Sequence, residues 1–180
     1  MKRCLFEKVL LNGGDTSKKN KIDEAMFLKS VELIAEDISS KYSLADSTLG
    51  LIGIARGALP LLTAISHYLE IRNISVMQIQ MTNSDNVKDY GTEHLINEML
   101  DPQVEHYIVL EDIVSHGRCS NFLINRLLSK GKKVDAVYSI VMNEYFEQHE
   151  FDYSIDVNYV YLINDKQWVH FFWEKGYLEN

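Results

Sequence analysis

The sequence contains few cysteines, few prolines and no long hydrophobic run. Its two cysteines, Cys4 and Cys119, match neither a disulfide framework nor a metal-ligand pair by their spacing. So few thiols favour a reducing cytoplasm. No stretch approaches the roughly 18 apolar residues that cross a bilayer, and the N-terminal segment lacks the apolar core of a signal peptide. We therefore expect a soluble cytoplasmic protein with no membrane partner.

Positive charge is also scarce. The chain has 18 Lys and Arg against 26 Asp and Glu, which gives a net charge of −8. A nucleic-acid-binding surface needs a basic stripe, and only two short basic runs occur, at 18–19 and 130–133. Nucleic acid is therefore not an expected partner. No repeat, low-complexity segment or shift in composition divides residues 1–180, which predicts one domain.

Helical and strand patterns alternate along the chain. Apolar residues at helical spacing predict a helix over 23–41, and a nearly continuous apolar run predicts a buried strand over 48–55. Pro60 suits the first turn of a helix that ends near 70. The other expected elements are strands at 74–81, 106–110, 134–142 and 158–163, a loop at 82–91, and helices from there to 100 and over 121–130. This alternation predicts an α/β fold with a parallel sheet.

Two of the expected strands end in loops with distinctive polar residues. Ligands of open parallel sheets bind beyond the carboxyl ends of the strands. The first such loop contains Arg56 and Gly57 between a strand and a helix. Arginine supplies a fixed positive charge, and glycine lets backbone amides approach an anion closely. Such turns also occur without ligands, so this loop alone is weak evidence for an anion site.

The second loop follows two adjacent acids, Glu111 and Asp112. Neighbouring carboxylates suit a ligand with cis hydroxyls and a divalent cation. The polar turn from Ser115 to Ser120 then opens a helix, and its hydroxyls and amides suit a phosphate group. The alternative is purely structural: the two acids end a strand, and Ser120 caps a helix.

Together these segments resemble the type I phosphoribosyltransferases, and most closely the purine salvage enzymes for hypoxanthine, guanine and xanthine. The family motif for 5-phosphoribosyl pyrophosphate (PRPP) is matched at 108–119 by Ile-Val-Leu-Glu-Asp-Ile-Val-Ser-His-Gly-Arg-Cys. The turn at 55–58 resembles the family's pyrophosphate loop, and 165–169 with 172–174 resemble its base-contacting segment. The resemblance covers about residues 22–176. It implies a Rossmann-like parallel-sheet fold with a small C-terminal hood.

The resemblance also implies roles for individual residues. Glu111, Asp112 and Ser115 would be catalytic, and Glu111 and Asp112 would bind Mg²⁺ together with Glu174. A cis peptide is implied at Ala55–Arg56, and a mobile lid at 82–91. The implied PRPP contacts are Arg56, Gly57, Glu111, Asp112, Ser115, His116, Gly117, Arg118, Cys119 and Ser120, and the implied base contacts are Asn143, Trp168 and Val169.

Several positions depart from the family pattern. Ser115 stands where the purine enzymes commonly have an aspartate, and Cys119 replaces a phosphate-binding threonine. Asn143 is the nearest match to a lysine that recognises the 6-oxo group. His116 is a possible acid or base, although a histidine there is more often a phosphate ligand or a surface residue.

The implied function is Mg²⁺-dependent transfer of a phosphoribosyl group from PRPP to a purine base, which yields a nucleoside 5′-monophosphate and pyrophosphate in purine salvage. PRPP and a nucleobase would be the partners, and family precedent implies a homodimer or homotetramer. Two alternatives remain open. One is a PRPP-binding regulatory or catalytically degenerate member, and the other is an enzyme of the same fold with another acceptor or a hydrolytic outcome.

Overall fold

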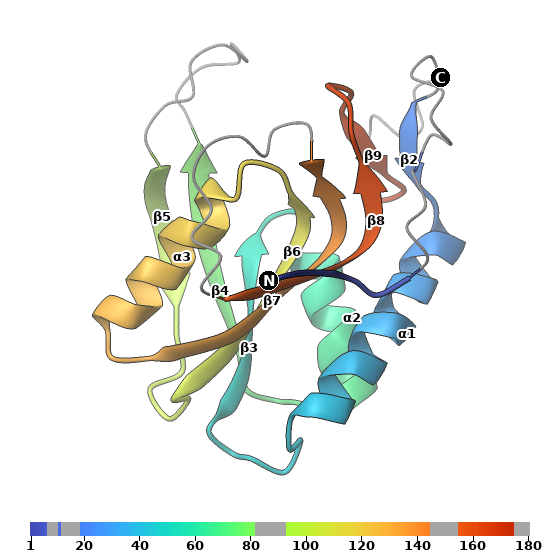
Figure 1. The fold of residues 1–180 in the computed structure, drawn as a ribbon. Helices are drawn as coiled ribbons and strands as arrows, with labels where there is room; N and C mark the ends of the chain where they lie inside the picture. Colours follow the sequence, from blue (N-terminus) through green and yellow to red (C-terminus); the bar gives the residue numbers. More distant parts are fainter. Residues whose placement is uncertain (7–10, 12–18, 82–92, 145–154, 175–180) are drawn as a thin grey trace.

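The computed structural model describes residues 1–6, 11, 19–81, 93–144 and 155–174. Its main element is a seven-stranded sheet in the order β1-β8-β7-β6-β3-β4-β5 (Figure 1). All neighbouring strands are parallel except β5, which runs antiparallel to β4. The strands are β1 (Lys2–Cys4), β3 (Leu49–Ala55), β4 (Ile74–Met81), β5 (Glu93–Met99), β6 (His106–Val114), β7 (Lys133–Asn143) and β8 (Asp156–Ile163).

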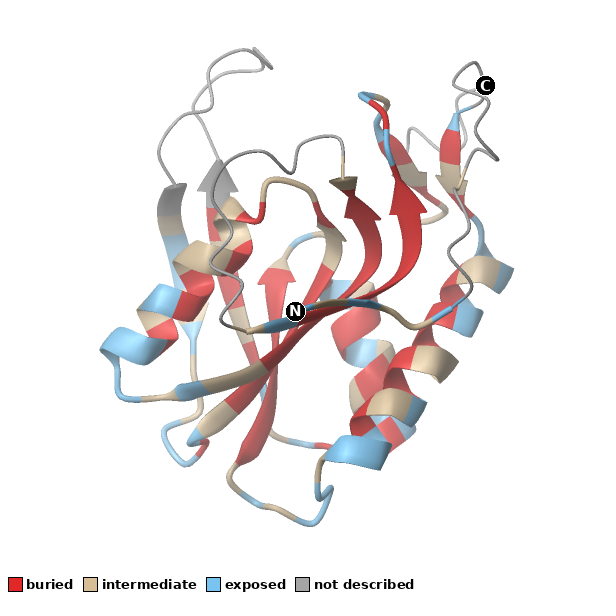
Figure 2. Ribbon diagram, viewed as in Figure 1, coloured by how far each residue is buried: buried red, intermediate tan, exposed pale blue. Residues whose placement is uncertain are grey.

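Helices cover both faces of this sheet. Helices α1 (Glu24–Lys41) and α2 (Leu59–Leu69) pack on one face, and α3 (Arg118–Ser129) packs on the other (Figure 1). The central strands are therefore buried on both sides, as Figure 2 shows. This double burial explains the nearly continuous apolar runs of β3 and β7, and it confirms the expected α/β architecture. Within the described residues, no helix combines the length and hydropathy that a membrane crossing requires.

The expected helix that ends at 100 is wrong. Residues Glu93–Met99 form β5, which pairs with β4 across a bulge between Gln78 and Ile79. The apolar residues of this segment fit a helical period, but pairing with the edge of the sheet outweighs that local preference. Glu98 on β5 is also ion-paired with Arg126 of α3. The expected loop and lid at 82–91 lie outside the described residues.

A second, two-stranded parallel sheet, here called the hood, consists of β2 (Asn20–Ile22) and β9 (Val169–Phe171). The sequence suggested a hood from the C-terminal segment, and the structure adds an N-terminal strand to it. Aromatic residues join the hood to α1. The rings of Phe171 and Trp173 stack with centroids 4.7 Å apart, and Phe27 of α1 contacts Trp173 edge-on at 5.2 Å.

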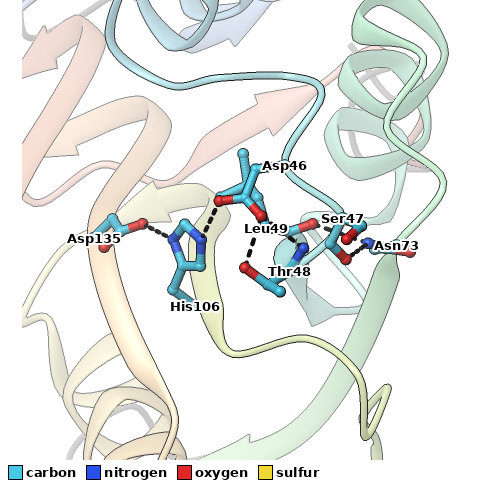
Figure 3. A network of polar contacts seen from close by, with 7 residues as sticks. All are labelled: Asp46, Ser47, Thr48, Leu49, Asn73, His106 and Asp135. Carbon is cyan, nitrogen blue, oxygen red and sulfur yellow. Dashed lines mark hydrogen bonds and ion pairs between the residues drawn. The ribbon is translucent and has the colours of Figure 1, made fainter.

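A polar network lies where the central strands begin, at the sheet edge away from the carboxyl ends (Figure 3). His106, the first residue of β6, has its Nδ1 2.5 Å from Asp135 of β7 and its Nε2 3.1 Å from Asp46. Asp46 also accepts hydrogen bonds from the backbone and hydroxyl of Thr48. The network therefore joins the start of β6 to the start of β7 and to the turn before β3.

This network predicts a pH-dependent contribution to stability. Burial alone lowers the pKa of His106, but the hydrogen bonds that its protonated ring donates to the carboxylates of Asp135 and Asp46 outweigh burial and raise the pKa above its usual value. A base with a raised pKa in the fold stabilises the protein below its unfolded pKa, and the effect is lost as the pH rises through the folded pKa. We expect His106→Gln to lower the melting temperature at pH 6 and much less at pH 9. The loss should be on the order of 0.5 kcal/mol, because solvent screens the pair.

Thermal unfolding at both pH values measures this effect. His67→Gln changes an exposed histidine on α2 and serves as the control. Equal losses at pH 6 and pH 9 would show that the His106 contribution is packing and not charge.

Candidate active site

The two polar loops meet where β3 and β6 end. These strands are adjacent and parallel, with Gly53 opposite Leu110, so Ala55 and Asp112 lie at the same level. A Cβ atom at Gly57 would overlap the carboxylate of Asp112. A side chain at position 57 would therefore displace the Asp112 carboxylate, so the turn after β3 rests directly on Asp112. The Ala55–Arg56 peptide bond is cis, as the family resemblance implies.

Glu111 is a buried acid, with only 7% of its surface exposed. Its carboxylate accepts a hydrogen bond from the hydroxyl of Ser120, which is fully buried. Burial raises the pKa of Glu111 to about 8; the Ser120 bond opposes this rise, and the charge of Asp112 adds to it. Glu111 therefore keeps a proton near neutral pH unless a cation or hydrogen-bond donors favour its charged form. The Ser120 hydroxyl, a predicted phosphate contact, points to Glu111 in this structure.

Asp112 is the second acid of the pair. Burial raises its pKa to about 6, the backbone amides of Ile113 and of Asp112 itself oppose the rise, and the charge of Glu174 adds to it. This electrostatic effect places Glu174 in the neighbourhood of Asp112. Glu174 follows β9, and its carboxylate accepts a hydrogen bond from the Phe171 amide at 3.2 Å. The hood thus brings a third acid toward the ends of the central strands.

Carboxylate oxygens are the ligands that Mg²⁺ prefers in proteins. In the part of the chain that the structure describes, no three acidic, histidine or cysteine side chains gather closely enough to hold a metal ion by themselves. Glu111 and Asp112 would fit Mg²⁺ only if a bound ligand supplied further oxygens. Magnesium ordinarily binds through one or two carboxylates plus substrate phosphates, so the two acids are compatible with that arrangement.

The turn after β6 leads into the N-terminus of α3. Gly117 is the N-cap residue with φ of 70°, a conformation that glycine adopts readily, and among the described residues no side chain caps the helix. The first amides of α3 and the helix dipole therefore favour an anion at this point. The hydroxyl of Ser115 lies 3.5 Å from Nδ1 of its neighbour His116. Arg118 and Cys119, two further predicted PRPP contacts, form the first turn of α3.

The predicted base-contacting residues lie near the ends of β7 and β8, in three different environments. Asn143 ends β7, is only 2% exposed, and donates a hydrogen bond to the backbone oxygen of Asp165 at 3.1 Å. Trp168 is 68% exposed, whereas Val169 is buried in the core. Trp168 is therefore the member of this group whose side chain is presented to solvent.

Sequence reasoning missed Asn20 altogether. This first residue of β2 is fully buried and donates a hydrogen bond to the Asp165 carboxylate at 3.1 Å. It stands at the end of a polar stretch whose composition indicates only a loop. No local signal in the sequence distinguishes it from its neighbours.

Comparison with known proteins gives a consistent result at the level of structure. No protein-family model matches the sequence, and no curated protein matches it either. A purine phosphoribosyltransferase from Pyrococcus horikoshii superposes with a TM-score of 0.65 at 17% identity, covering 86% of this chain and 94% of that one. The xanthine-guanine-hypoxanthine phosphoribosyltransferase of Helicobacter pylori gives 0.64 at 16% identity, covering 88% and 95%.

A protein from Neisseria gonorrhoeae, solved with bound ppGpp, superposes with a TM-score of 0.63 at 19% identity, and the match covers 87% of this chain and 90% of that one. These matches extend over most of both chains in each case. At such low identities they establish architecture and leave the substrate open. The chain therefore has the fold of the type I phosphoribosyltransferases.

Proposed function

We propose that this protein is a Mg²⁺-dependent purine phosphoribosyltransferase that uses PRPP to convert hypoxanthine, guanine or xanthine into the nucleoside 5′-monophosphate. The observation that carries the proposal is the seating of the Arg56–Gly57 turn on Asp112, beside the buried acid Glu111. An anion-binding turn, an acid pair and an open helix N-terminus at neighbouring strand ends match the three parts of PRPP: pyrophosphate, ribose and 5-phosphate.

In the proposed mechanism, Glu111 and Asp112 accept hydrogen bonds from the ribose hydroxyls, and the amides at the start of α3 bind the 5-phosphate. Arg56 and Gly57 bind the pyrophosphate, and Trp168 stacks on the base. The bond from the anomeric carbon to pyrophosphate breaks as a ring nitrogen of the base attacks that carbon. The residues contribute mainly by alignment and by stabilising charge on the leaving group. Bound Mg²⁺, held by Glu111 and Asp112, would supply positive charge for the pyrophosphate, with Glu174 near a second ion.

Detection of nucleotide products by mass spectrometry tests the proposal. The protein is incubated with PRPP, Mg²⁺ and each of several purine and pyrimidine bases, and with each component omitted in turn. The expected result is one or more purine monophosphates that form only in the complete mixture. Consumption of PRPP without any base would instead indicate a hydrolase, and binding of PRPP without any product would indicate a regulatory protein.

The serine at position 115 gives a prediction of its own. A serine hydroxyl is a poor base near neutral pH, whereas a carboxylate can take the proton that leaves the purine ring. We expect Ser115→Asp to raise turnover about tenfold or more, because general base catalysis is commonly worth at least that much. Ser115→Asn is the control, because asparagine has nearly the same shape as aspartate but no basic group. A loss of turnover in the aspartate variant would show that the turn is fitted to serine.

A second candidate function is the binding of a guanosine nucleotide that carries pyrophosphate groups, without transfer. The observation that favours it is the likeness to the Neisseria gonorrhoeae protein solved with ppGpp. The same amides that would bind PRPP can bind any pyrophosphate. Calorimetric titration with ppGpp in the presence and absence of PRPP separates the two candidates. Competition together with turnover supports a transferase that ppGpp inhibits, whereas tight ppGpp binding without turnover supports the regulatory function.

A further inference from the structure

One turn of the chain is held by hydrogen bonds from both sheets. The turn between β8 and β9 contains Asp165, whose carboxylate accepts hydrogen bonds from Asn20 of the hood at 3.1 Å and from the Gln167 amide at 2.8 Å. Its backbone oxygen accepts a third hydrogen bond, at 3.1 Å, from Asn143 of the main sheet. Asp165, Asn20 and Asn143 are all buried. Side chains from both sheets thus meet on Asp165.

Asn20 and Asn143 reach Asp165 from two strands that are far from it in the sequence. Asn20 pairs with Val169 in the hood, so its backbone lies beside β9 while its side chain reaches back to Asp165. Asn143 approaches the same residue from the end of β7, where it pairs with Ile163. The turn is therefore held on one side by β2 of the hood and on the other by β7 of the main sheet. We call this pair of contacts the clamp.

Trp168 is the residue that this clamp positions. It follows Gln167, whose amide is bound to Asp165, and precedes Val169, which is buried and paired with Asn20. Both neighbours are fixed, while the Trp168 ring itself is mostly exposed. Because the backbone on both sides of Trp168 is fixed and its ring is open to solvent, the ring can stack on a planar ligand at little entropic cost.

We propose that Asn20 and Asn143 are positioning residues that fix the Asp165 turn, and thereby Trp168, for binding the nucleobase. This inference rests on the proposed function and deepens it. It gives strand β2 of the hood a part in base binding. It also assigns Asn143 an indirect role, in place of the direct contact with the base that the sequence suggested.

Removal of the Asn20 donor tests the clamp. Asn20→Asp removes the donor and places a second carboxylate against Asp165. Oδ1 of Asn20 is itself buried without a hydrogen-bond partner in the described structure. A single oxygen of Asp165, Oδ1, accepts both the Asn20 bond and the Gln167 bond, so Asp165→Asn with its oxygen in that place keeps both bonds. The double variant Asn20→Asp with Asp165→Asn removes one of the two facing charges but leaves the Asn20 donor missing, because the oxygen at position 165 stays with the Gln167 amide.

A matched control is available elsewhere in the chain. Asn158 of β8 is also a buried asparagine whose Oδ1 has no partner among the described atoms, and its Nδ2 donates to the Val137 oxygen at 3.4 Å. Asn158→Asp introduces the same buried charge within the main sheet, away from the Asp165 turn. Any effect of buried charge on general stability should therefore appear in both variants.

Two readouts are measured on every variant. The first is quenching of tryptophan fluorescence by acrylamide in the ligand-free protein, with Trp168→Phe used to assign the signal of Trp168. The second is the set of KM values for PRPP and for hypoxanthine, guanine and xanthine. In Asn20→Asp we expect altered quenching of Trp168 and a KM for the base raised about tenfold, with the KM for PRPP changed less than about twofold. Asp165→Asn should keep the base KM within about threefold of the original, whereas the double variant should stay impaired because the Asn20 donor is still missing.

The outcomes separate the inference from the function on which it rests. If no base is converted by the unaltered protein, the proposed function fails, while the quenching series still decides whether Asn20 positions Trp168. Equal changes in Asn20→Asp and Asn158→Asp would overturn the inference, as would a folded double variant with the original base KM, because relief of charge alone would then account for the effect. If Asn20→Asp does not fold, Asn20→Ala removes the donor without adding charge, and unchanged Trp168 quenching and base KM in that variant would equally overturn it.

Discussion

Turnover is expected to fall at least about a hundredfold when Asp112 is replaced by asparagine, while the fold stays intact. The amide has nearly the same shape as the carboxylate and fits under the Gly57 turn, but it cannot supply negative charge to the ribose hydroxyls or to Mg²⁺. Burial raises the pKa of Asp112 to about 6, so its charge is costly in the ligand-free protein. Removal of that charge should not destabilise the fold, and steady-state kinetics with PRPP and the accepted base measure the effect.

The control for this experiment is Asp135→Asn. Asp135 makes its hydrogen bond to His106 where the central strands begin, at the opposite edge of the sheet from Asp112. The same change of charge there should leave kcat close to its original value. Near-normal turnover in Asp112→Asn would remove Asp112 from the mechanism. A melting temperature well below the original would show that its carboxylate is instead a structural group.

The central strands could be predicted from the sequence because their environment is uniform. Helices cover both faces of β3 and β7, so most residues of these strands are apolar. Such a nearly continuous apolar run indicates a strand buried on both faces. At the edge of the sheet this relation weakens. Strand β5 has exposed apolar residues at Ile96 and Met99, and its spacing imitates a helix. Only its pairing with β4, which is a tertiary contact, decides the outcome.

The candidate site follows the same division between local and distant determinants. Arg56, Gly57, Glu111 and Asp112 stand in short motifs at strand ends, so topology alone predicts that the two loops meet. The packing of Gly57 on Asp112 then follows from adjacent parallel strands. The hydrogen bond from Asn20 to Asp165, by contrast, joins residues 145 positions apart, and no pattern in one sequence indicates it.

The acid pair at the end of β6 is costly to the stability of this fold. Glu111 is buried beside Asp112, and burial together with the charge of Asp112 raises the pKa of Glu111 to about 8, so ionising Glu111 raises the free energy of the ligand-free state. An anionic ligand that brings Mg²⁺ would supply the missing positive charge. The presence of a buried Glu111 and a partly buried Asp112, where apolar residues would pack better, is therefore an argument for ligand binding at this position.

Glu111→Gln tests that cost directly, and we expect it to make the ligand-free protein more stable at pH 8. The pKa of Glu111 is raised to about 8 in the fold, so the folded state favours the neutral acid. An acid whose pKa is raised in the folded state does not lower the free energy of unfolding at pH values below its unfolded pKa. It lowers this free energy increasingly as the pH rises toward the folded pKa. The variant should therefore gain on the order of 3 kcal/mol in free energy of unfolding at pH 8 and almost nothing at pH 4. Glutamine keeps an oxygen that can accept the Ser120 hydrogen bond.

Urea unfolding of the unaltered protein and of Glu111→Gln at pH 4, 6 and 8 measures the difference. The pH-dependent contribution of His106 is the same in both proteins, so it does not affect this difference. Glu98→Gln is a control of opposite sign. Hydrogen bonds from Arg126 and Lys130 lower the pKa of Glu98 to about 2 against the effect of burial, so its loss should reduce stability at pH 8. Glu111→Gln should also lose PRPP turnover while it gains stability, because the carboxylate that destabilises the ligand-free protein is the one proposed to hold the ribose and Mg²⁺. Loss of stability at pH 8 would instead mean that Glu111 is ionised and paired within the fold, so that the acid pair is part of the scaffold.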